Sequence, residues 1–262
     1  MHIVAIHGWK EESAELAQAL AAALGLTAFE VRQRLIGGGP AVVARFADAH
    51  QAEALAATLR RCGVAALVVD VDEVRGRGGR FVVRRFELDA ERLFLESVSG
   101  ESAAIPYGEI ELLLLAMGIT SQTETATVTE RKFSLGATIM TGGIPVMKKV
   151  EREEEVRGEE REKALFLYAG SHPALVFRQS GMSYDGLGPA MKQSRELNFT
   201  HLVAELRRLA PRAAYDERLQ QRAGQVRVLG PALAPDTNLD LAAEILARTL
   251  RPNPGGSGGA GA

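Results

Sequence analysis

The sequence predicts an α+β protein in which a small β-α-α-β-α-β domain precedes a β-rich domain. In the first 73 residues, short apolar runs alternate with segments whose apolar residues recur at helical spacing. A segment rich in glycine and arginine, residues 74–80, interrupts this alternation and is expected to be a linker. From residue 81 onward, strand-like runs dominate. The 262 residues suffice for two domains, each with its own core.

The first strand is expected at residues 2–6, which are apolar and partly β-branched. Between residues 11 and 24, leucines recur every four residues, and Gly25 stands where a helix C-cap would place it. A second helix is expected to follow at once, because Thr27 and Glu30 have the spacing of a capping box. The segment therefore predicts two consecutive helices after one strand.

A further strand, helix and strand complete the first domain. Residues 41–46 have strand composition, and Asp48 is placed to cap a helix that Gly63 ends. The apolar run 64–69 then forms the third strand. Three strands and three amphipathic helices are enough for a small core, so residues 1–73 are predicted to fold on their own.

This first domain resembles the C-terminal domain of the bacterial ribosomal stalk protein. The resemblance rests on the order of elements and on Leu24-Gly25-Leu26, Gly39-Pro40, and Ala52-Glu53-Ala54-Leu55 with Leu59 and Gly63. In that family a two-helix hairpin binds translation factors. Here the stretch from Leu26 to Pro40 is longer by about one helical turn, and arginines only approximate the family's lysine-rich face. The resemblance therefore implies the fold, and the candidate protein-binding residues on the hairpin are Leu26, Phe29, Arg32 and Arg34.

The second domain, residues 81–215, is expected to be a set of strands closed by a helix. Residues 81–86 and 92–98 predict a hairpin. Residues 148–163 are almost entirely charged and are expected to be an exposed insertion in loop conformation. Asn198 is expected to cap an amphipathic helix that ends before Pro211.

Residues 81–211 loosely resemble a bacterial pleckstrin-homology-like domain. The resemblance rests on element order and on the phrase Ile105-Pro106-Tyr107-Gly108-Glu109-Ile110. It implies a β-barrel with a C-terminal helix, and it makes Tyr107 and Ile110 candidate binding residues on an open face. A C-terminal extension, residues 216–251, is expected to contain a helix over 238–250, and residues 252–262 form a glycine-rich flexible tail.

The residues that carry chemistry in enzymes do not form a recognisable constellation in this sequence. His7-Gly8 follows a strand as in α/β-hydrolases, but the Gly-x-Ser-x-Gly nucleophile turn is missing. None of the five histidines has the spacing of a zinc helix, and Cys62 is the single cysteine. We therefore expect no catalytic residue, no metal site and no cofactor.

The charge balance and the hydropathy limit the classes of partner that the sequence predicts. A formal charge of −2 lacks the basic excess of nucleic-acid binders. The apolar run 112–119 is too short for a transmembrane helix. The sequence thus predicts a soluble, cytoplasmic, non-enzymatic protein that binds another protein. Two alternatives stay open: an enzyme acting on a small molecule in an interdomain cleft, and a peripheral membrane-binding module that uses the arginines between residues 75 and 85.

Overall fold

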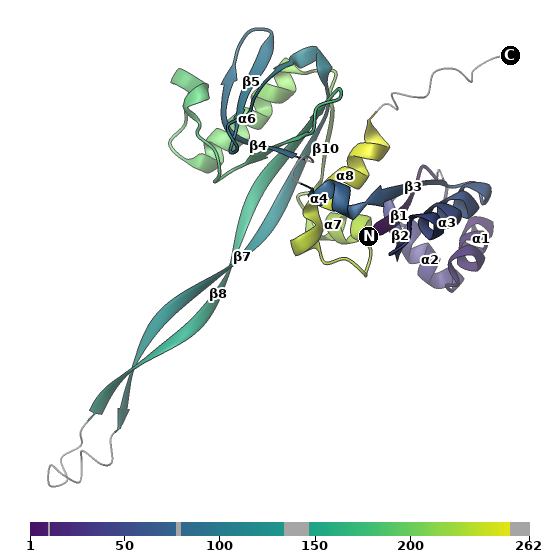
Figure 1. Cartoon of the computed structure of the whole chain (residues 1–262), viewed down its shortest axis with the longest axis horizontal. Helices are drawn as coiled ribbons and strands as arrows, with labels where there is room; N and C mark the ends of the chain where they lie inside the picture. Colours follow the sequence, from purple (N-terminus) through teal and green to yellow (C-terminus); the bar gives the residue numbers. More distant parts are fainter. Residues whose placement is uncertain (10, 77–79, 134–146, 252–262) are drawn as a thin grey trace. The chain divides into compact units, whose positions relative to one another are not determined.

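The computed structural model describes residues 1–9, 11–76, 80–133 and 147–251, with the backbone alone described in 119–133 and 147–160. The chain divides into two units. The larger consists of Met1–Gly118 and Glu162–Ala262, and the smaller is Ile119–Arg161. The smaller unit contains parts of two long neighbouring strands, β7 (Ile110–Phe133) and β8 (Met147–Ala169) (Figure 1).

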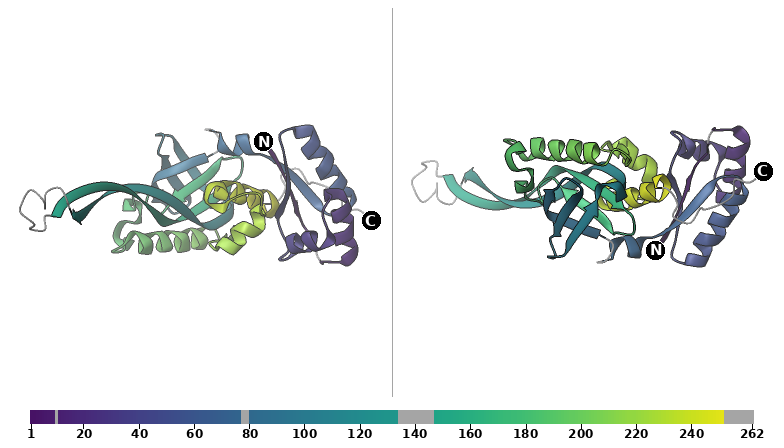
Figure 2. Two further views of the ribbon diagram at one scale, coloured as in Figure 1. Left: turned by 90° about the horizontal axis from the view of Figure 1, so that it is seen from below. Right: turned by 90° about the horizontal axis from the view of Figure 1, so that it is seen from above.

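A three-stranded antiparallel sheet in the order β2-β1-β3 forms the first part of the larger unit. Three helices cover one face of this sheet, as Figure 2 shows. In chain order the elements are β1 (His2–His7), α1 (Ala14–Leu24), α2 (Ala28–Leu35), β2 (Ala41–Phe46), α3 (Ala49–Arg61), β3 (Ala65–Asp70) and α4 (Val71–Arg75).

The helix ends in this part of the chain are fixed by local side-chain chemistry. Gly25 ends α1 in the left-handed conformation at φ 64°, where a Cβ would be strained. The Thr27 hydroxyl accepts from the Glu30 backbone N–H, and the Glu30 carboxylate accepts from that of Thr27. Asp48 accepts from the Gln51 backbone N–H at the start of α3. The predicted capping box and the predicted Asp48 cap are therefore confirmed.

A seven-stranded mixed sheet in the order β10-β7-β8-β9-β4-β5-β6 forms the second part. The pairs β10/β7 and β4/β9 are parallel, whereas β8/β9, β4/β5 and β5/β6 are antiparallel. The remaining elements are β4 (Arg80–Leu88), β5 (Arg92–Ser97), β6 (Ser102–Pro106), η1 (Tyr107–Glu109), β9 (Ala174–Arg178), η2 (Asp185–Ala190), α6 (Arg195–Leu209), β10 (Ala214–Leu219), α7 (Arg222–Leu229) and α8 (Pro235–Leu250).

The predicted α+β class is confirmed, but the predicted closed barrel is wrong. The large sheet is open, with β10 and β6 at the two ends of its strand order. Strand β10, which the sequence pattern did not predict, pairs in parallel with β7 and extends the sheet. A parallel pair requires a long crossover connection, and here the intervening chain includes β8, β9 and α6. The local pattern of β10 alone could not reveal that pairing.

Three further expectations about elements are corrected. The charged run 148–163 is part of strand β8 and not a loop. The last helix begins at Pro235, and Asn238 marks a kink inside it (φ −131°, ψ 20°). Asn198 lies within α6, whose cap is Ser194. The Asn198 side chain accepts from the Lys192 backbone N–H and donates to the Lys192 carbonyl, before the helix. Asn198 therefore bonds to backbone as a capping residue does, but it does not cap α6.

The alternation along β7 separates two cores. Leu112, Leu114 and Ala116 face a core that includes α7 and α8, and Leu113 and Leu115 face a core that includes α6. The first of these cores also contains four side chains from the small sheet, those of Ile3, Ala5, Val42 and Val69. The small sheet therefore has helices α1–α3 on one face and shares a core with α7, α8 and the large sheet on the other (Figure 2).

The predicted linker 74–80 is partly structured. Arg75 is the last residue of α4, and Val74 is buried. Arg80 is the first residue of β4. Residues 77–79 lie outside the described part, as does the predicted tail 252–262. The independent folding of residues 1–73 stays a prediction.

Candidate functional site

The exposed face of α2 holds most of the residues that the sequence predicted for binding. Phe29 is 71% exposed, Arg32 and Gln33 are exposed, and Ile36 at the helix end is 42% exposed. These positions are i, i+3, i+4 and i+7, so they lie on one side of the helix. We call Phe29, Arg32, Gln33 and Ile36 the α2 face.

The opposite side of α2 anchors the helix to the small sheet. Val31 and Leu35 are buried in the core below α1, α2 and α3. The indole N–H of Trp9 donates to the Leu35 carbonyl at 3.0 Å. Because these contacts fix the helix, the α2 face is displayed by a rigid support.

The other predicted hairpin residues are less accessible. Leu26 is half-buried against the same core. Arg34 is also half-buried, and its Nη1 donates to the Val43 carbonyl at 2.9 Å. These two residues therefore support the hairpin, whereas Phe29 and Arg32 are presented to solvent.

The two binding residues predicted in the second domain are core residues. Tyr107 and Ile110 are both buried beside β5 and α6. The Tyr107 hydroxyl donates to the Asp89 carbonyl at 3.0 Å, and burial raises the pKa of this tyrosine. Both side chains pack into the core at the connection between β6 and β7. Tyr107 and Ile110 therefore do not form the open binding face that was predicted.

Sequence reasoning missed a polar pocket of about 170 Å³ between α4, β8, β9 and α8. Its charged walls come from segments far apart in the chain: Glu73, Arg80, Asp240, Glu244, Arg248 and Arg251. The one available signal was the arginine cluster after residue 75. Arg80 from that cluster lines the pocket and pairs with Asp240.

The pocket's arginines are held by carboxylates and carbonyls. Arg248 bonds Glu244 at 2.7 Å and lies 3.6 Å from Glu73. Arg251 bonds Glu111 at 2.6 Å and donates to the Gly170 carbonyl, also at 2.6 Å. The guanidinium groups therefore have fixed positions at the pocket wall.

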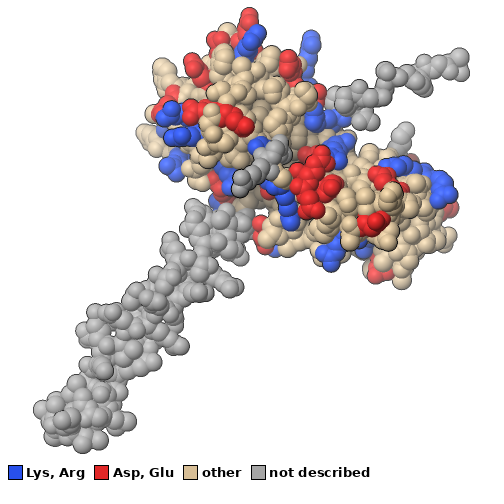
Figure 3. All heavy atoms as spheres, in the orientation of Figure 1, with Lys and Arg blue, Asp and Glu red and all other residues tan. Residues whose placement is uncertain are grey.

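The arginines outside the pocket, which the membrane-binding alternative uses, have side-chain partners within the described chain. Arg84 and Arg85 lie 3.9 and 3.8 Å from Glu96 of the adjacent strand. Arg75 donates to the Asn238 side chain at 2.8 Å. Lys, Arg, Asp and Glu side chains of both signs appear on the face that Figure 3 shows. These pairings reduce the unmatched positive charge that a membrane-binding surface needs.

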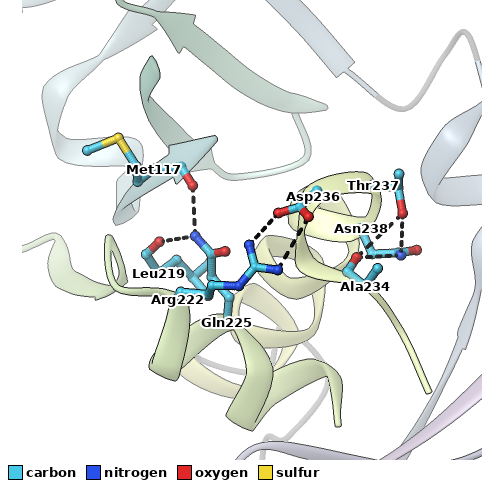
Figure 4. Close-up of polar contacts among 8 residues, drawn as sticks. All are labelled: Met117, Leu219, Arg222, Gln225, Ala234, Asp236, Thr237 and Asn238. Atoms are coloured by element: carbon cyan, nitrogen blue, oxygen red, sulfur yellow. Dashed lines mark hydrogen bonds and ion pairs between the residues drawn. The ribbon is translucent and has the colours of Figure 1, made fainter. Parts of the chain in front are cut away.

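Buried amides join α7 and α8 to their surroundings (Figure 4). Gln225 is buried, and its Nε2 donates to the carbonyls of Met117 and Leu219, each at 2.7 Å. Asn238 in the α8 kink donates to the Ala234 carbonyl at 2.8 Å. Gln225 thus satisfies one carbonyl of β7 and one of β10, where the parallel pairing of the two strands ends.

Replacing Gln225 with leucine is expected to lower the free energy of unfolding by about 1–3 kcal/mol, because two carbonyls lose their donor. Urea unfolding monitored by circular dichroism measures the change. The matched variant Gln51→Leu changes an exposed glutamine of α3 and is expected to alter stability by less than about 0.5 kcal/mol. Equal stability of the two variants would contradict the role given to the Gln225 amide.

The described residues hold no single helix that is long and apolar enough to cross a membrane, although the bent pair α1 and α2 passes that test when taken together. Both helices bury apolar residues against the small sheet. Comparisons with protein-family models, curated proteins and solved structures find no match for this chain.

Proposed function

We propose that this chain is a non-enzymatic protein-binding protein that uses the α2 face. The observation that carries the proposal is the exposure of Phe29, which is unusual for so large an apolar side chain. Ile36, the C-cap residue of α2, follows Phe29 by seven residues. At 1.5 Å per residue the two side chains are about 10 Å apart along the helix axis, a spacing that two apolar anchors of one partner segment can span.

The charge of the α2 face defines the chemistry of the partner. Arg32 lies between the two apolar residues and forms no ion pair with the side chains that the structure describes. Arg227 lies beside Gly37, just beyond the end of α2. We therefore propose that the partner is a protein with an amphipathic, acidic segment. The carboxylates of that segment would face these arginines.

The resemblance to the ribosomal stalk protein's C-terminal domain is retained as part of this proposal. The order β1, α1, α2, β2, α3, β3 and the capped α1–α2 hairpin support it. The pleckstrin-homology-like barrel receives no such support, because the large sheet is open.

Replacing Phe29 with alanine is expected to weaken partner binding by about 2 kcal/mol, roughly thirty-fold, because an aromatic anchor is lost. The full-length chain is immobilised, the captured protein is identified, and its affinity is measured by surface plasmon resonance. Stability should change little, since Phe29 packs against so little of the chain.

The control is Phe94→Ala, which removes a phenylalanine that is 41% exposed on β5. This variant should bind as the unmodified chain does. Arg32→Glu should weaken binding, because it places a negative charge opposite the acidic segment. Added salt should then strengthen binding of this variant, whereas it should weaken binding of the unmodified chain. Equal affinity of the Phe29 and Phe94 variants, or a partner segment without acidic residues, would contradict the proposal.

A further inference from the structure

The polar pocket beside α8 has charges of both signs in equal number. Arg80, Arg248 and Arg251 contribute three positive charges to its walls, and Glu73, Asp240 and Glu244 contribute three negative charges. His172 also lines the pocket. A wall of this kind matches a ligand that carries both charges better than it matches a simple anion or cation.

Donors and acceptors remain available on the charged side chains. Arg251 uses Nε and Nη2 in its bonds, and its Nη1 contacts no hydrogen-bond acceptor among the described residues. Asp240 binds Arg80 through Oδ2, and Glu244 binds Arg248 through Oε1. The second oxygen of each carboxylate accepts no bond from the described part of the chain. The pocket therefore offers N–H groups to a carboxylate and oxygens to an ammonium group.

Tyr168 gives independent evidence of a ligand. Its side chain lines the pocket, its residue is 3% exposed, and its ring lies 5.7 Å beneath the Arg251 guanidinium. Its hydroxyl has no hydrogen-bond partner among the described residues. Every fully buried polar side-chain atom of those residues does have a partner, so the Tyr168 hydroxyl is not fully buried. The hydroxyl must therefore reach the solvent of the pocket. Burial raises the pKa of Tyr168, and the Glu244 charge raises it further, so the group stays a neutral donor.

The volume of the pocket and the apolar part of its wall limit the size and the side chain of the ligand. A volume of about 170 Å³ equals that of roughly six water molecules at about 30 Å³ each, which admits a molecule of about six to eight non-hydrogen atoms. Val74, Phe166, Pro173 and Ala174 supply apolar surface beside the charged groups. We propose that the pocket binds a zwitterionic α-amino acid with a small apolar side chain, with Tyr168 as a ligand-contacting residue.

Isothermal titration of the full-length chain at neutral pH tests this proposal with three probes. L-Valine carries both charges, 3-methylbutanoate lacks the ammonium group, and 2-methylpropylamine lacks the carboxylate. L-Valine is expected to bind at least about tenfold more tightly than either analogue, because each analogue can bond only the remaining donors or only the remaining acceptors of the pocket. Equal binding of 3-methylbutanoate would show an anion site and overturn the proposal, as would no heat or NMR saturation transfer with millimolar L-valine.

Tyr168→Phe locates the site, because it keeps the ring beneath Arg251 and removes the hydroxyl. It is expected to weaken L-valine binding about tenfold. The matched control is Tyr184→Phe, which removes another buried tyrosine hydroxyl, one bonded to the Gln179 carbonyl at 2.7 Å in the other core. Unchanged binding by the Tyr168 variant would overturn the assignment. Phe29→Ala should leave L-valine binding intact, so this test is separate from that of the protein-binding proposal.

Discussion

Replacing Gly186 with alanine is expected to lower the free energy of unfolding by about 3 kcal/mol. Gly186 lies in η2, directly against strand β4. A Cβ at this position would overlap the carbonyl oxygen of Phe86 and lie 2.8 Å from its carbonyl carbon. Because the obstacle is strand backbone, η2 has to move away from the sheet.

That movement would disturb the contacts that hold η2 in place. The Ser183 backbone N–H donates to the Arg84 carbonyl at 2.9 Å. The rings of Phe86 and Tyr184 meet edge to face, with 6.4 Å between their centroids. In a chain of this size, a loss of about 3 kcal/mol corresponds to a fall in melting temperature of roughly 6–12 °C.

Differential scanning calorimetry measures this effect. The control is Gly108→Ala, because a Cβ at Gly108 has no atom within 4 Å and its φ is not in the left-handed region. The control should have an unchanged or slightly higher melting temperature. Equal melting temperatures for the two variants would show that η2 does not rest on β4 as described.

Replacing Leu246 of α8 with alanine is expected to cost about 2–5 kcal/mol. Leu246 is fully buried in the core that contains β7 and β8 side chains and residues of the small sheet on the face opposite α1–α3. Truncation removes apolar contacts and leaves a cavity that the surrounding elements fill only in part. Leu197→Ala is the control, since Leu197 of α6 is 54% exposed, and its effect should stay below about 0.5 kcal/mol.

The same variant also tests how the two sheets unfold. Because Ile3 and Ala5 of β1 belong to the Leu246 core, amide exchange in β1 is expected to accelerate together with exchange in β9. Exchange that accelerates in β9 and stays unchanged in β1 would contradict shared unfolding. It would support the sequence-based prediction that residues 1–73 fold on their own.

The amino-acid sequence by itself determined the elements whose signals are local. Thr27 and Glu30 specify a helix start through bonds between residues three apart. Gly25 specifies a helix end because it accepts a positive φ. Short apolar, partly β-branched runs also predicted the three strands of the small sheet, whose side chains are buried in part on both faces.

Only the tertiary structure decided the features that depend on distant partners. The charged run 148–163 has no apolar pattern, yet it lies in β8 beside β7, because backbone pairing between strands does not require apolar side chains. Burial of Tyr107 and exposure of Phe29 depend on what packs over each residue. The pocket brings Arg80 to Asp240 across 160 positions of sequence. No local pattern encodes such a contact, because only the folded chain places Asp240 of α8 beside Arg80.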